Sequence, residues 1–412
     1  MAHRKRTTCR GCGGKRFRLF LRLGPMPLAN SFLRSPEEFE TEPSYPLDVY
    51  FCEICSLVQL LDVIDPELLF RNYIYVTGTS DTIAAHNVEY AKTVVEMLQA
   101  GPSDLIVEVA SNDGSLLKCF QRHGVRTIGV EPATNIAEKA RAAGVETINR
   151  FFDSKAAAEI RRSHGPAKAV IGNNVLAHVD DTRDFLLGCR DLLSAEGLTV
   201  IEVPYVREFL DRLEYDTVYH EHLCYFSCGS LLRLCDEVGL VIVRIDQVPV
   251  HGGSLRAYAG RVEHYKEHAA AVVALREQER RQGLEDIALY ERFAERVAKN
   301  RQAVRAALDD MRRQGMTVAG YGAPAKGNTL LNYCGIDTDL LPYTVDKNPM
   351  KVGLYTPGMH IPVKPVSALV ECQPDCVMIL AWNFADEIIR QQQDYQARGG
   401  RFLIPIPEPR IV

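Results

Sequence analysis

Four residues at Tyr219–His222, the YHEH of EYDTVYHEHLCYF, combine two histidines, a glutamate and a tyrosine. Histidine is a base that works near neutral pH, and such a turn can aim a base and a hydrogen-bonding carboxylate into one pocket. A metal site is a poor fit, because the stretch has no H-E-x-x-H pattern. If it is extended, Tyr219 and Glu221 point one way and the histidines the other. The pattern predicts a catalytic turn; a capped surface turn or satisfied core histidines are the structural alternative.

Three histidines are candidates for the catalytic base. We expect His222 to be the base, and His220 is its neighbour in the same stretch. His178, in NNVLAHVDD, follows the preceding predicted strand and could reach the same pocket. His220 and His178 are therefore the competing bases.

Two Cys-x-x-Cys pairs have the spacing of zinc knuckles. Cys9 and Cys12 lie in TCRGCGG, and Cys52 and Cys55 lie in FCEICSL. Their four thiolates satisfy a tetrahedral Zn²⁺ and leave no open position for chemistry. A redox role suits them less, because neither pair opens a helix after a strand. We predict a structural zinc that keeps a short N-terminal module folded, the alternative being chance pairs of buried cysteines.

Carboxylates in two predicted strand regions could bind a nucleoside cofactor. The run LIVEV, followed by ASNDGS and SLLKCFQRHG, is typical of a buried strand, a turn and a helix, and it carries Glu108. A second strand, TIGVEP, ends at Glu131, whose carboxylate can accept hydrogen bonds from both hydroxyls of a ribose. Gly114 lets the backbone of the turn approach a cofactor.

This pattern is similar to that of class I S-adenosylmethionine methyltransferases. It departs from their usual glycine-rich loop, because Ala110 and Asn112 stand where glycines are commoner. A dinucleotide dehydrogenase is the rival, but its three-glycine G-x-G-x-x-G is absent from this turn. A βαβ unit without a ligand is the structural alternative. The predicted cofactor-binding residues are Glu108, Ala110, Asn112, Gly114, Glu131, Pro132, Asn173 and Asn174.

The elements that position these residues follow from the alternation of predicted strands and helices along the chain. AKAVIGNNVLAHV and GLTVIEVPYV provide a third and a fourth strand. Strands that alternate with helices predict an α/β protein with a doubly wound sheet, whose ligand lies at the carboxyl ends of the strands. Because YHEH follows the fourth strand, we expect it near that edge, close to a donated methyl group.

A second α/β unit is predicted at the C-terminal end. The charged stretch 262–314 predicts two long helices, and TVAGYG, PYTVD, CVMILAW and FLIPIP predict strands. GYGAPAKG brings Gly320, Gly322 and Lys326 to a strand-to-helix turn, where backbone amides and one lysine can receive a pyrophosphate. Asp346 ends a strand where it could contact a ribose or base; the structural alternative is a plain turn. Tyr321 and Asn328 complete the predicted nucleotide contacts.

The bulk composition narrows the class of protein. A chain of 412 residues is expected to form two or three domains. Its 46% hydrophobic and 25% charged residues are typical of a soluble globular protein, and its net charge of -5 gives no basic footprint for nucleic acid. We find no apolar run of about 18 residues and no apolar core of a signal peptide at the N-terminus. We therefore expect a cytoplasmic protein that contacts neither nucleic acid nor membrane.

Over essentially its full length the chain resembles the sugar C-methyltransferases of antibiotic biosynthesis, which act on nucleotide-linked 4-keto-deoxysugars. The resemblance includes CRGC, CEIC, VEVASNDGSLL, GVEP, NNVLAHV, YHEHLCYFS, VHGGSLR and VAGYGAPAKGNTLLNYCGI. It implies a zinc-binding N-terminal domain, a central S-adenosylmethionine domain and a C-terminal α/β domain that helps to hold the nucleotide sugar.

Methylation of carbon at neutral pH requires a carbanion, and a ketone makes one accessible as an enolate. The enzyme then needs a base near the C–H, donors near the developing oxyanion and the methyl donor in line. We assign His222 as the base and Tyr219 as the donor to the enolate oxygen. The resemblance implies that Glu221, with Tyr73 or Tyr75 of RNYIYVTGTS, holds a sugar substituent; the choice between the two tyrosines stays open.

The resulting prediction is an S-adenosylmethionine-dependent C-methyltransferase of a dTDP-4-keto-deoxysugar, acting at C-3 rather than C-5, as a monomer or weak oligomer. Its expected domains are a zinc-binding module (1–65), a methyltransferase domain (66–245) and a C-terminal α/β domain (246–412). One alternative is an O- or N-methyltransferase of a sugar or small metabolite, which needs no enolisation. The other is a non-enzymatic zinc-containing nucleic-acid binder, which the acidic charge disfavours.

Overall fold

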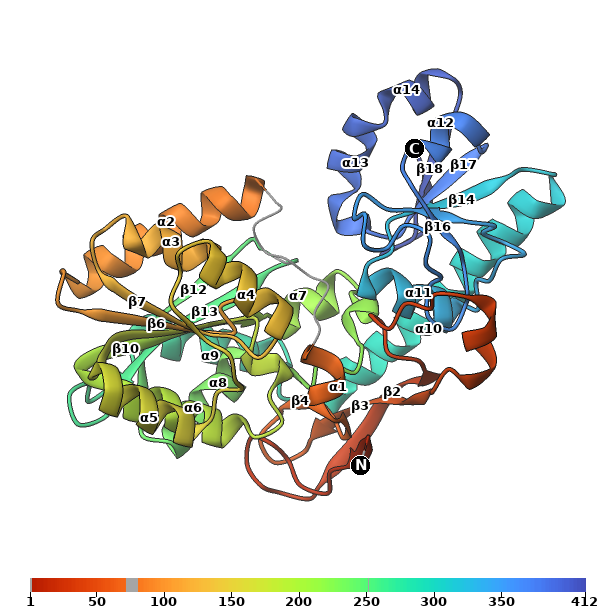
Figure 1. Ribbon diagram of the computed structural model, residues 1–412. Coiled ribbons are helices and arrows are strands. Elements are labelled where there is room, and N and C mark those ends of the chain that lie inside the picture. Colours follow the sequence, from red (N-terminus) through yellow and green to blue (C-terminus); the bar gives the residue numbers. More distant parts are fainter. Residues whose placement is uncertain (1, 72–80, 251) are drawn as a thin grey trace.

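The computed structural model describes residues 2–71, 81–250 and 252–412. Figure 1 shows two lobes, a central one coloured orange to green and a C-terminal one coloured blue, with the N-terminal module below them in red. The two tyrosines of the segment RNYIYVTGTS, Tyr73 and Tyr75, lie outside the described residues. Among the residues that are described, no helix is long and apolar enough to cross a membrane.

The N-terminal module is built on a small antiparallel sheet. Its strand order is β11–β4–β3–β2, and a separate ribbon joins β1 to β5. The strand β11 (Cys224–Tyr225) comes from the segment directly after the YHEH turn, so a distant part of the chain completes this sheet. The module's other elements are β1 (His3–Lys5), β2 (Phe17–Met26), η1 (Pro36–Thr41), β3 (Tyr45–Cys52), β4 (Val58–Leu60), β5 (Asp62–Ile64) and α1 (Pro66–Phe70).

A seven-stranded sheet forms the central lobe, in the order β12–β13–β10–β9–β6–β7–β8. The strands from β10 to β8 are parallel; β13 pairs antiparallel with β10, and β12 pairs antiparallel with β13. All five residues of β6 are buried, as its apolar composition predicts. The strands are β6 (Leu105–Val109), β7 (Arg126–Val130), β8 (Thr147–Ile148), β9 (Ala167–Asn173), β10 (Leu193–Pro204), β12 (Leu240–Val248) and β13 (Ser254–Arg261).

Helices cover both faces of this sheet, so the predicted doubly wound arrangement is confirmed (Figure 1). They are α2 (Asp81–Leu98), α3 (Ser115–Gln121), α4 (Thr134–Ala142), α5 (Ser154–His164), η3 (Leu176–His178), α6 (Thr182–Leu192), α7 (Val206–Asp211), η4 (Tyr215–Thr217), α8 (Cys228–Glu237) and α9 (Ala270–Arg281).

The central sheet extends further along the chain than the expected domain boundary at 245/246. That boundary falls inside β12, and β13 then returns to pair with β10 from Leu198 to Pro204. Helix α9 packs on α8 and β12. The hairpin and α9 therefore lie with the central lobe, because pairing with β10 covers a strand edge that would otherwise be open.

The C-terminal lobe holds a second, six-stranded sheet, which confirms the predicted second α/β unit. Its order is β16–β15–β14–β17–β18–β19, which in chain order is 3-2-1-4-5-6, the order of dinucleotide-binding folds. The 262–314 stretch contains two helices, α9 and α10, as predicted. The elements are α10 (Ile287–Arg313), β14 (Val318–Tyr321), α11 (Ala325–Cys334), β15 (Thr344–Val345), β16 (Val363–Lys364), α12 (Ala368–Cys372), β17 (Cys376–Ile379), η5 (Trp382–Phe384), α13 (Ala385–Gln391), α14 (Gln393–Ala397), β18 (Arg401–Ile404) and β19 (Arg410–Ile411).

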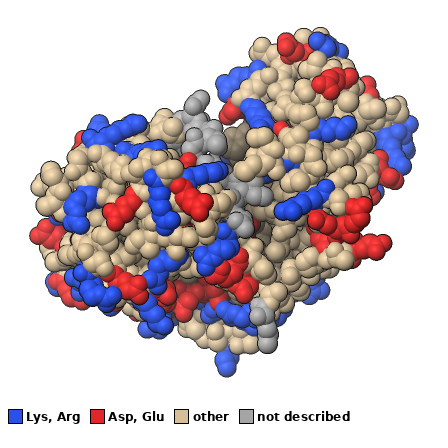
Figure 2. Space-filling model, in the orientation of Figure 1, with Lys and Arg blue, Asp and Glu red and all other residues tan. Residues whose placement is uncertain are grey.

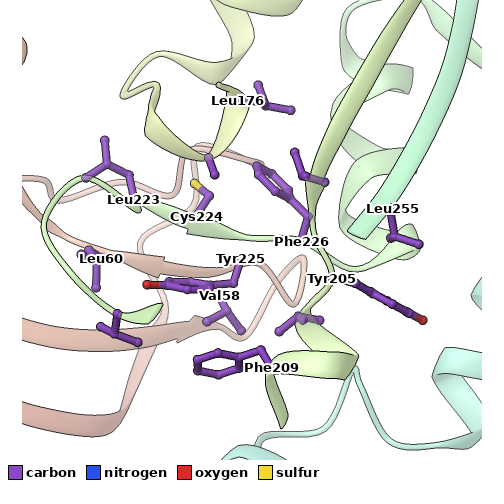
Figure 3. Close-up of a cluster of buried hydrophobic side chains, with 14 of the residues drawn as sticks. Val58, Leu60, Leu176, Tyr205, Phe209, Leu223, Cys224, Tyr225, Phe226 and Leu255 are labelled. Atoms are coloured by element: carbon purple, nitrogen blue, oxygen red, sulfur yellow. The ribbon is translucent and has the colours of Figure 1, made fainter. Parts of the chain in front are cut away.

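One hydrophobic core runs through all three parts of the chain. Figure 3 shows part of this core, in which Tyr225 and Phe226, from the segment after the YHEH turn, lie near Val58 of the N-terminal module and Phe209 of α7. Basic and acidic side chains alternate over the face seen in Figure 2, and a notch separates the two lobes at its upper edge. The described part of the molecule therefore packs as one body around the predicted catalytic turn.

Candidate active site

The YHEH stretch is a tight turn. The backbone amide of His222 donates to the carbonyl of Tyr219 at 2.9 Å, and the hydroxyl of Tyr219 lies 2.8 Å from Nε2 of His222. The stretch is therefore a turn, and the side-chain alternation considered for an extended stretch does not apply. A turn brings the first and fourth residues together, whereas an extended strand separates them.

The contacts of His222 assign its tautomer. Nδ1 lies 2.8 Å from the carbonyl oxygen of Thr217, and a carbonyl can only accept a hydrogen bond. Nδ1 therefore carries the proton in the neutral ring, and Nε2 is the basic nitrogen. The hydroxyl of Tyr219 donates to that nitrogen, so the two side chains form a dyad.

His220 faces away from the dyad. It is 1% exposed, and its Nε2 donates to the carbonyls of Tyr45 and Pro46 in the N-terminal module, at 3.3 and 3.2 Å. Burial lowers the pKa of His220, which disfavours its protonated form. These contacts give His220 a structural role, because they fix the turn against β3.

His178 lies beside the dyad, as predicted. Its ring packs edge-on against that of His222, with the ring centroids 4.9 Å apart. Burial lowers the pKa of His178 to about 4, so the ring is neutral at physiological pH. Its Nδ1 is buried without a hydrogen-bond partner among the described residues. His178 is thus a weak base, but it can accept a hydrogen bond from a ligand.

Glu221 is 4% exposed, and its contacts reveal a site residue that the sequence did not indicate. Nδ2 of Asn30, from the N-terminal module, donates to Oε1 of Glu221 at 2.7 Å. Asn328 on α11 in turn donates to the carbonyl of Ala29 at 2.7 Å. Asn328, a predicted nucleotide contact, therefore holds the segment that carries Asn30.

The turn after β6 is a cradle built around Glu131. Its two carboxylate oxygens accept from the backbone amides of Asn112 and Ala133, both at 2.8 Å. Ala110 has φ +53° and Asn112 has φ +49°, which is the left-handed region that glycine adopts most easily. The backbone thus keeps the glycine-type conformation with other residues in place. Each carboxylate oxygen retains a lone pair that can accept from a ribose hydroxyl.

The remaining predicted cofactor residues lie along the same edge. Glu108 is buried, and burial, with the charges of Asp113 and Glu131, raises its pKa well above the usual value. Asn174 has φ +52° and a buried Oδ1 without a partner among the described residues, whereas Oδ1 of Asn173 accepts from Tyr90 at 3.1 Å. Gly114 has φ +75° and precedes α3, and the carbonyl of Pro132 accepts from Arg71 and Asn149.

The YHEH turn and this cradle lie at one end of the central sheet. Val109 pairs with Gly172 in the parallel strands β6 and β9, so their carboxyl ends are adjacent. Asn173 ends β9, and His178 follows on η3 within five residues of it, against His222. The sheet thus brings the predicted cofactor residues and the predicted base to the same edge, as parallel α/β sheets do with their ligands.

The GYGAPAKG turn of the C-terminal lobe is arranged like the Glu131 cradle. Asp346 follows β15 and accepts from the backbone amides of Ala323 and Asn348, at 2.7 and 2.8 Å. Lys326 has its Nζ buried without a hydrogen-bond partner among the described residues. Lys351, which the sequence did not indicate, reaches the carbonyl of Ala323 at 2.7 Å. Tyr321, at the end of β14, accepts from Gln392 through its hydroxyl at 3.4 Å, so its side chain points toward α13 and α14.

The four knuckle cysteines meet at one point. Their sulfur atoms all lie within 4.8 Å of one another, with Cys9 and Cys55 3.5 Å apart and Cys12 and Cys52 3.6 Å apart. Four sulfurs that bind one zinc at about 2.3 Å are about 3.8 Å from each other, so the cluster fits this ion. The sulfur of Cys9 also accepts from Gly11 and Gln59, which favours the thiolate form.

Family models match three successive parts of the chain. They describe a zinc binding domain (residues 9–70), a methyltransferase domain (84–245) and a C-methyltransferase C-terminal domain (249–407). A similar curated protein is C-methyltransferase NovU of Streptomyces niveus, 38% identical over 404 residues, which are 98% of this chain and 96% of that protein.

Solved structures also show similarity to part of the chain. One is a magnesium protoporphyrin IX methyltransferase from Synechocystis with bound S-adenosylmethionine, which is 14% identical, has a TM-score of 0.34 and covers 46% of this chain and 88% of that one. Another is an S-adenosylmethionine-dependent methyltransferase from Clostridium acetobutylicum, 10% identical with a TM-score of 0.36, which covers 43% of this chain and 92% of the other.

Proposed function

The chain belongs to the C-methyltransferases that carry an N-terminal zinc-binding domain and a dedicated C-terminal domain, and we propose that it methylates a carbon of a nucleotide-linked 4-keto-deoxysugar. It is an S-adenosylmethionine-dependent enzyme with a structural zinc. The proposed substrate is a dTDP-linked 4-keto-deoxysugar, and the proposed position is C-3 rather than C-5. We also propose a cytoplasmic monomer or weak oligomer.

The observation that carries this proposal is the Tyr219–His222 dyad with its fixed tautomer. A carbon next to a ketone must lose a proton before it can be methylated. In the proposed mechanism this proton passes to Nε2 of His222, while the C–H bonding electrons move to the ketone oxygen as an enolate. The Nδ1–H to Thr217 bond holds the ring in place and stabilises the imidazolium that forms.

Two roles are open to the hydroxyl of Tyr219 in this mechanism. This hydroxyl binds Nε2 in the free protein, so it either moves toward the enolate oxygen when the sugar enters or passes the proton on to His222. Bound S-adenosylmethionine supplies the electrophilic methyl group that the carbanion takes up. The enolate electrons form the new C–C bond, which restores the ketone, and the proton on His222 passes to solvent.

The other residues near the dyad are proposed to hold the sugar. Glu221, fixed by Asn30, accepts from a sugar hydroxyl or amino substituent. His178 accepts a further hydrogen bond through its buried Nδ1. Tyr73 or Tyr75 is proposed to line the same pocket.

The cofactor is proposed to lie along the edge formed by the ends of β6, β7 and β9. Glu131 would accept from both ribose hydroxyls, while the Ala110–Gly114 turn approaches the cofactor and Glu108 faces its amino-acid part. Pro132, Asn173 and Asn174 complete this edge. Support comes from the lone pairs that Glu131 retains after its two backbone contacts.

The nucleotide is proposed to bind at the GYGAPAKG turn, with its diphosphate on Lys326 and the start of α11 and its sugar ring at Asp346. Support for this proposal comes from the 3-2-1-4-5-6 strand order, since folds with this order bind phosphates at the turn after their first strand. Lys326→Ala should therefore weaken dTDP binding at least tenfold while leaving S-adenosylhomocysteine binding unchanged, as measured by calorimetry. The matched control is Lys347→Ala, an exposed lysine of the same lobe. Equal losses in the two variants would contradict the assignment.

The function is tested by exchange of solvent deuterium into a dTDP-4-keto-6-deoxysugar without methyl donor, followed by methyl transfer from labelled S-adenosylmethionine. An enolising C-methyltransferase incorporates deuterium next to the ketone and then a methyl group on that carbon. His222→Asn should lose about 10²–10⁴-fold in both reactions. If His178→Asn rather than His222→Asn abolished exchange, the role of base would pass to His178.

An O- or N-methyltransferase is the alternative activity that the residues leave open, and a non-enzymatic zinc-containing nucleic-acid binder is a more distant one. The same experiment separates them, because a methyl group on oxygen or nitrogen needs no exchangeable C–H. The domain limits 1–65, 66–245 and 246–412 remain a proposal, with β12, β13 and α9 on the side of the central lobe.

A further inference from the structure

Three charged side chains meet where the catalytic turn borders the C-terminal lobe. Glu214 and Asp216 lie at the turn η4, and Lys326 lies on α11. Each has a buried polar atom without a hydrogen-bond partner among the described residues, namely Oε1 of Glu214, Oδ1 of Asp216 and Nζ of Lys326. Burial raises the pKa of Asp216, and the positive charge of Lys326 partly offsets this. Such a buried cluster is costly to assemble, so its connections to the site are informative.

Asp216 is connected to the proposed base, His222, through one residue, Thr217. The indole Nε1 of Trp382, on η5, donates to Oδ2 of Asp216 at 2.6 Å. Thr217 follows Asp216 directly in η4, and its backbone amide donates to the carbonyl of Glu214 at 3.0 Å. The carbonyl of Thr217 is the group that accepts from Nδ1 of His222 at 2.8 Å. A chain of contacts therefore runs from the C-terminal lobe to the proposed base.

The same segment is held by two further contacts from the C-terminal helices. The hydroxyl of Thr329 on α11 donates to the carbonyl of Val218 at 3.1 Å. The hydroxyl of Tyr215 donates to Asn300 on α10 at 2.8 Å. Thr217 is 8% exposed and Asp216 is fully buried, so the segment has little freedom to rotate its peptides.

We propose that Asp216 and Trp382 are positioning residues for His222. Through them the C-terminal lobe fixes the orientation of the Thr217 carbonyl, which in turn keeps the proton of the neutral His222 ring on Nδ1 and leaves Nε2 basic. This inference rests on the proposed role of His222 as the base. It gives the C-terminal lobe a part in the chemistry in addition to nucleotide binding.

The test uses the full-length protein labelled with ¹⁵N-histidine, in which the His222 signals are identified by their loss in His222→Asn. Wild-type His222 should show a protonated Nδ1 and an unprotonated Nε2. Trp382→Phe removes the indole donor but keeps an aromatic ring at a partly exposed position. We expect mixed tautomers in this variant and a shift of at least about half a unit in the pH at which the ring protonates.

Turnover is measured alongside on the proposed substrate. Trp382→Phe should lower kcat roughly 10- to 100-fold, the scale of a misplaced catalytic group, with KM and S-adenosylhomocysteine affinity within about twofold of wild type. Asp216→Asn is the second variant, and it decides the question if Trp382→Phe does not fold. Tyr395→Phe is the matched control, because it likewise removes an aromatic donor of the C-terminal lobe, the Tyr395 hydroxyl that donates to the carbonyl of Pro374 at 2.9 Å, outside the contacts named for the turn.

Unchanged His222 signals and turnover in Trp382→Phe and Asp216→Asn would overturn the proposal, as would an equal effect of Tyr395→Phe. The two proposals fail separately. If the wild-type protein does not methylate a dTDP-4-keto-deoxysugar, the substrate assignment is wrong, whereas the ¹⁵N signals still decide whether Trp382 and Asp216 position His222.

Discussion

At the scale of single residues, the two ring nitrogens of His222 have different hydrogen-bond partners and therefore different roles. Nδ1 contacts a backbone carbonyl, which requires a proton on that nitrogen, and Nε2 contacts the Tyr219 hydroxyl. Sequence reasoning reached the identities of Tyr219 and His222 but not their pairing. Whether a four-residue stretch is extended or turned depends on contacts with Thr217 and Ala177, which local sequence does not encode.

The dyad predicts that losses in Tyr219 and His222 variants are not additive. Tyr219→Phe should lower turnover roughly 10- to 100-fold, because the base loses the hydroxyl that orients it. Tyr219→Phe/His222→Asn should be no slower than His222→Asn alone, since residues that act as a unit show strong coupling. Rates of methyl transfer from labelled S-adenosylmethionine check this. If the loss of turnover in the double variant equalled the product of the two single losses, Tyr219 would instead act independently on the ketone oxygen.

Glu108 predicts a dependence of stability on pH. Burial, with the charges of Asp113 and Glu131, raises its pKa above the unfolded value of about 4.3. Above pH 4.3 the folded state then holds a proton that the unfolded state has lost, so the free energy of unfolding falls as pH rises through this window. Glu108→Gln should remove this trend and stabilise the cofactor-free protein at pH 7 by roughly 1–3 kcal/mol.

Thermal unfolding of both proteins between pH 5 and pH 8 checks the prediction for Glu108. Glu138→Gln, at an exposed position on α4, serves as the control and should change stability by less than about 0.5 kcal/mol. The same slope against pH in the wild type and in Glu108→Gln would show that another group titrates in this range.

At the scale of elements, the turn between β6 and α3 keeps a left-handed backbone at Ala110 and Asn112. The conformation is required because the Asn112 amide must reach Glu131, and Asn tolerates it better than Ala does. The sequence indicated the turn and its departure from glycine, but not that the backbone keeps the glycine conformation. That result needed the positions of Glu131 and of the helix that follows.

The substitution Ala110→Gly should therefore cost unusually little stability. Relief of left-handed strain, on the order of 1 kcal/mol, offsets the entropy that glycine adds to the unfolded chain. We expect Ala110→Gly to change the free energy of unfolding by less than about 1 kcal/mol and to keep S-adenosylhomocysteine binding. Ala110→Val should lose at least about 1 kcal/mol, because β-branched residues avoid this region. Ala140→Gly, inside α4, is the control for an ordinary helical alanine; urea unfolding of the three variants provides the comparison.

The longer helices and strands could be predicted from the pattern of apolar and charged residues, whereas the shortest strands could not. The buried strands β6, β7, β9 and β10 and the helices α9 and α10 all lie where apolar runs or charged helical stretches predict them. The two-residue strand β11 was not predicted, because its pairing partner β4 lies far away in the sequence. The β12–β13 hairpin crosses the expected boundary at 245/246, because the sequence of a strand does not reveal which sheet it joins.

At the scale of the whole molecule, the N-terminal module is part of the active-site architecture. Its strand β4 pairs with β11 directly after the YHEH turn, its Asn30 binds Glu221, and its Glu42 accepts from Gly358 and His360 of the C-terminal lobe. The sequence indicated a zinc clip and a separate catalytic centre. It could not indicate that the first supports the second, because that relation depends on packing between distant segments.

Removal of the zinc should therefore abolish turnover while sparing the cofactor site. In Cys9→Ser/Cys12→Ser we expect no bound zinc by elemental analysis, a lower melting temperature and a loss of methyl transfer of at least about 10²-fold, because the sheet that holds β11 depends on the metal. S-adenosylhomocysteine affinity should stay within about threefold, since the hydrogen-bond partners of Glu131 all lie in the central lobe. Cys372→Ser, at the exposed cysteine, is the matched control and should behave like the wild type. Full activity in the metal-free variant would mean that the N-terminal module holds the catalytic turn without its zinc, through hydrophobic packing around Val58 and Tyr225 alone.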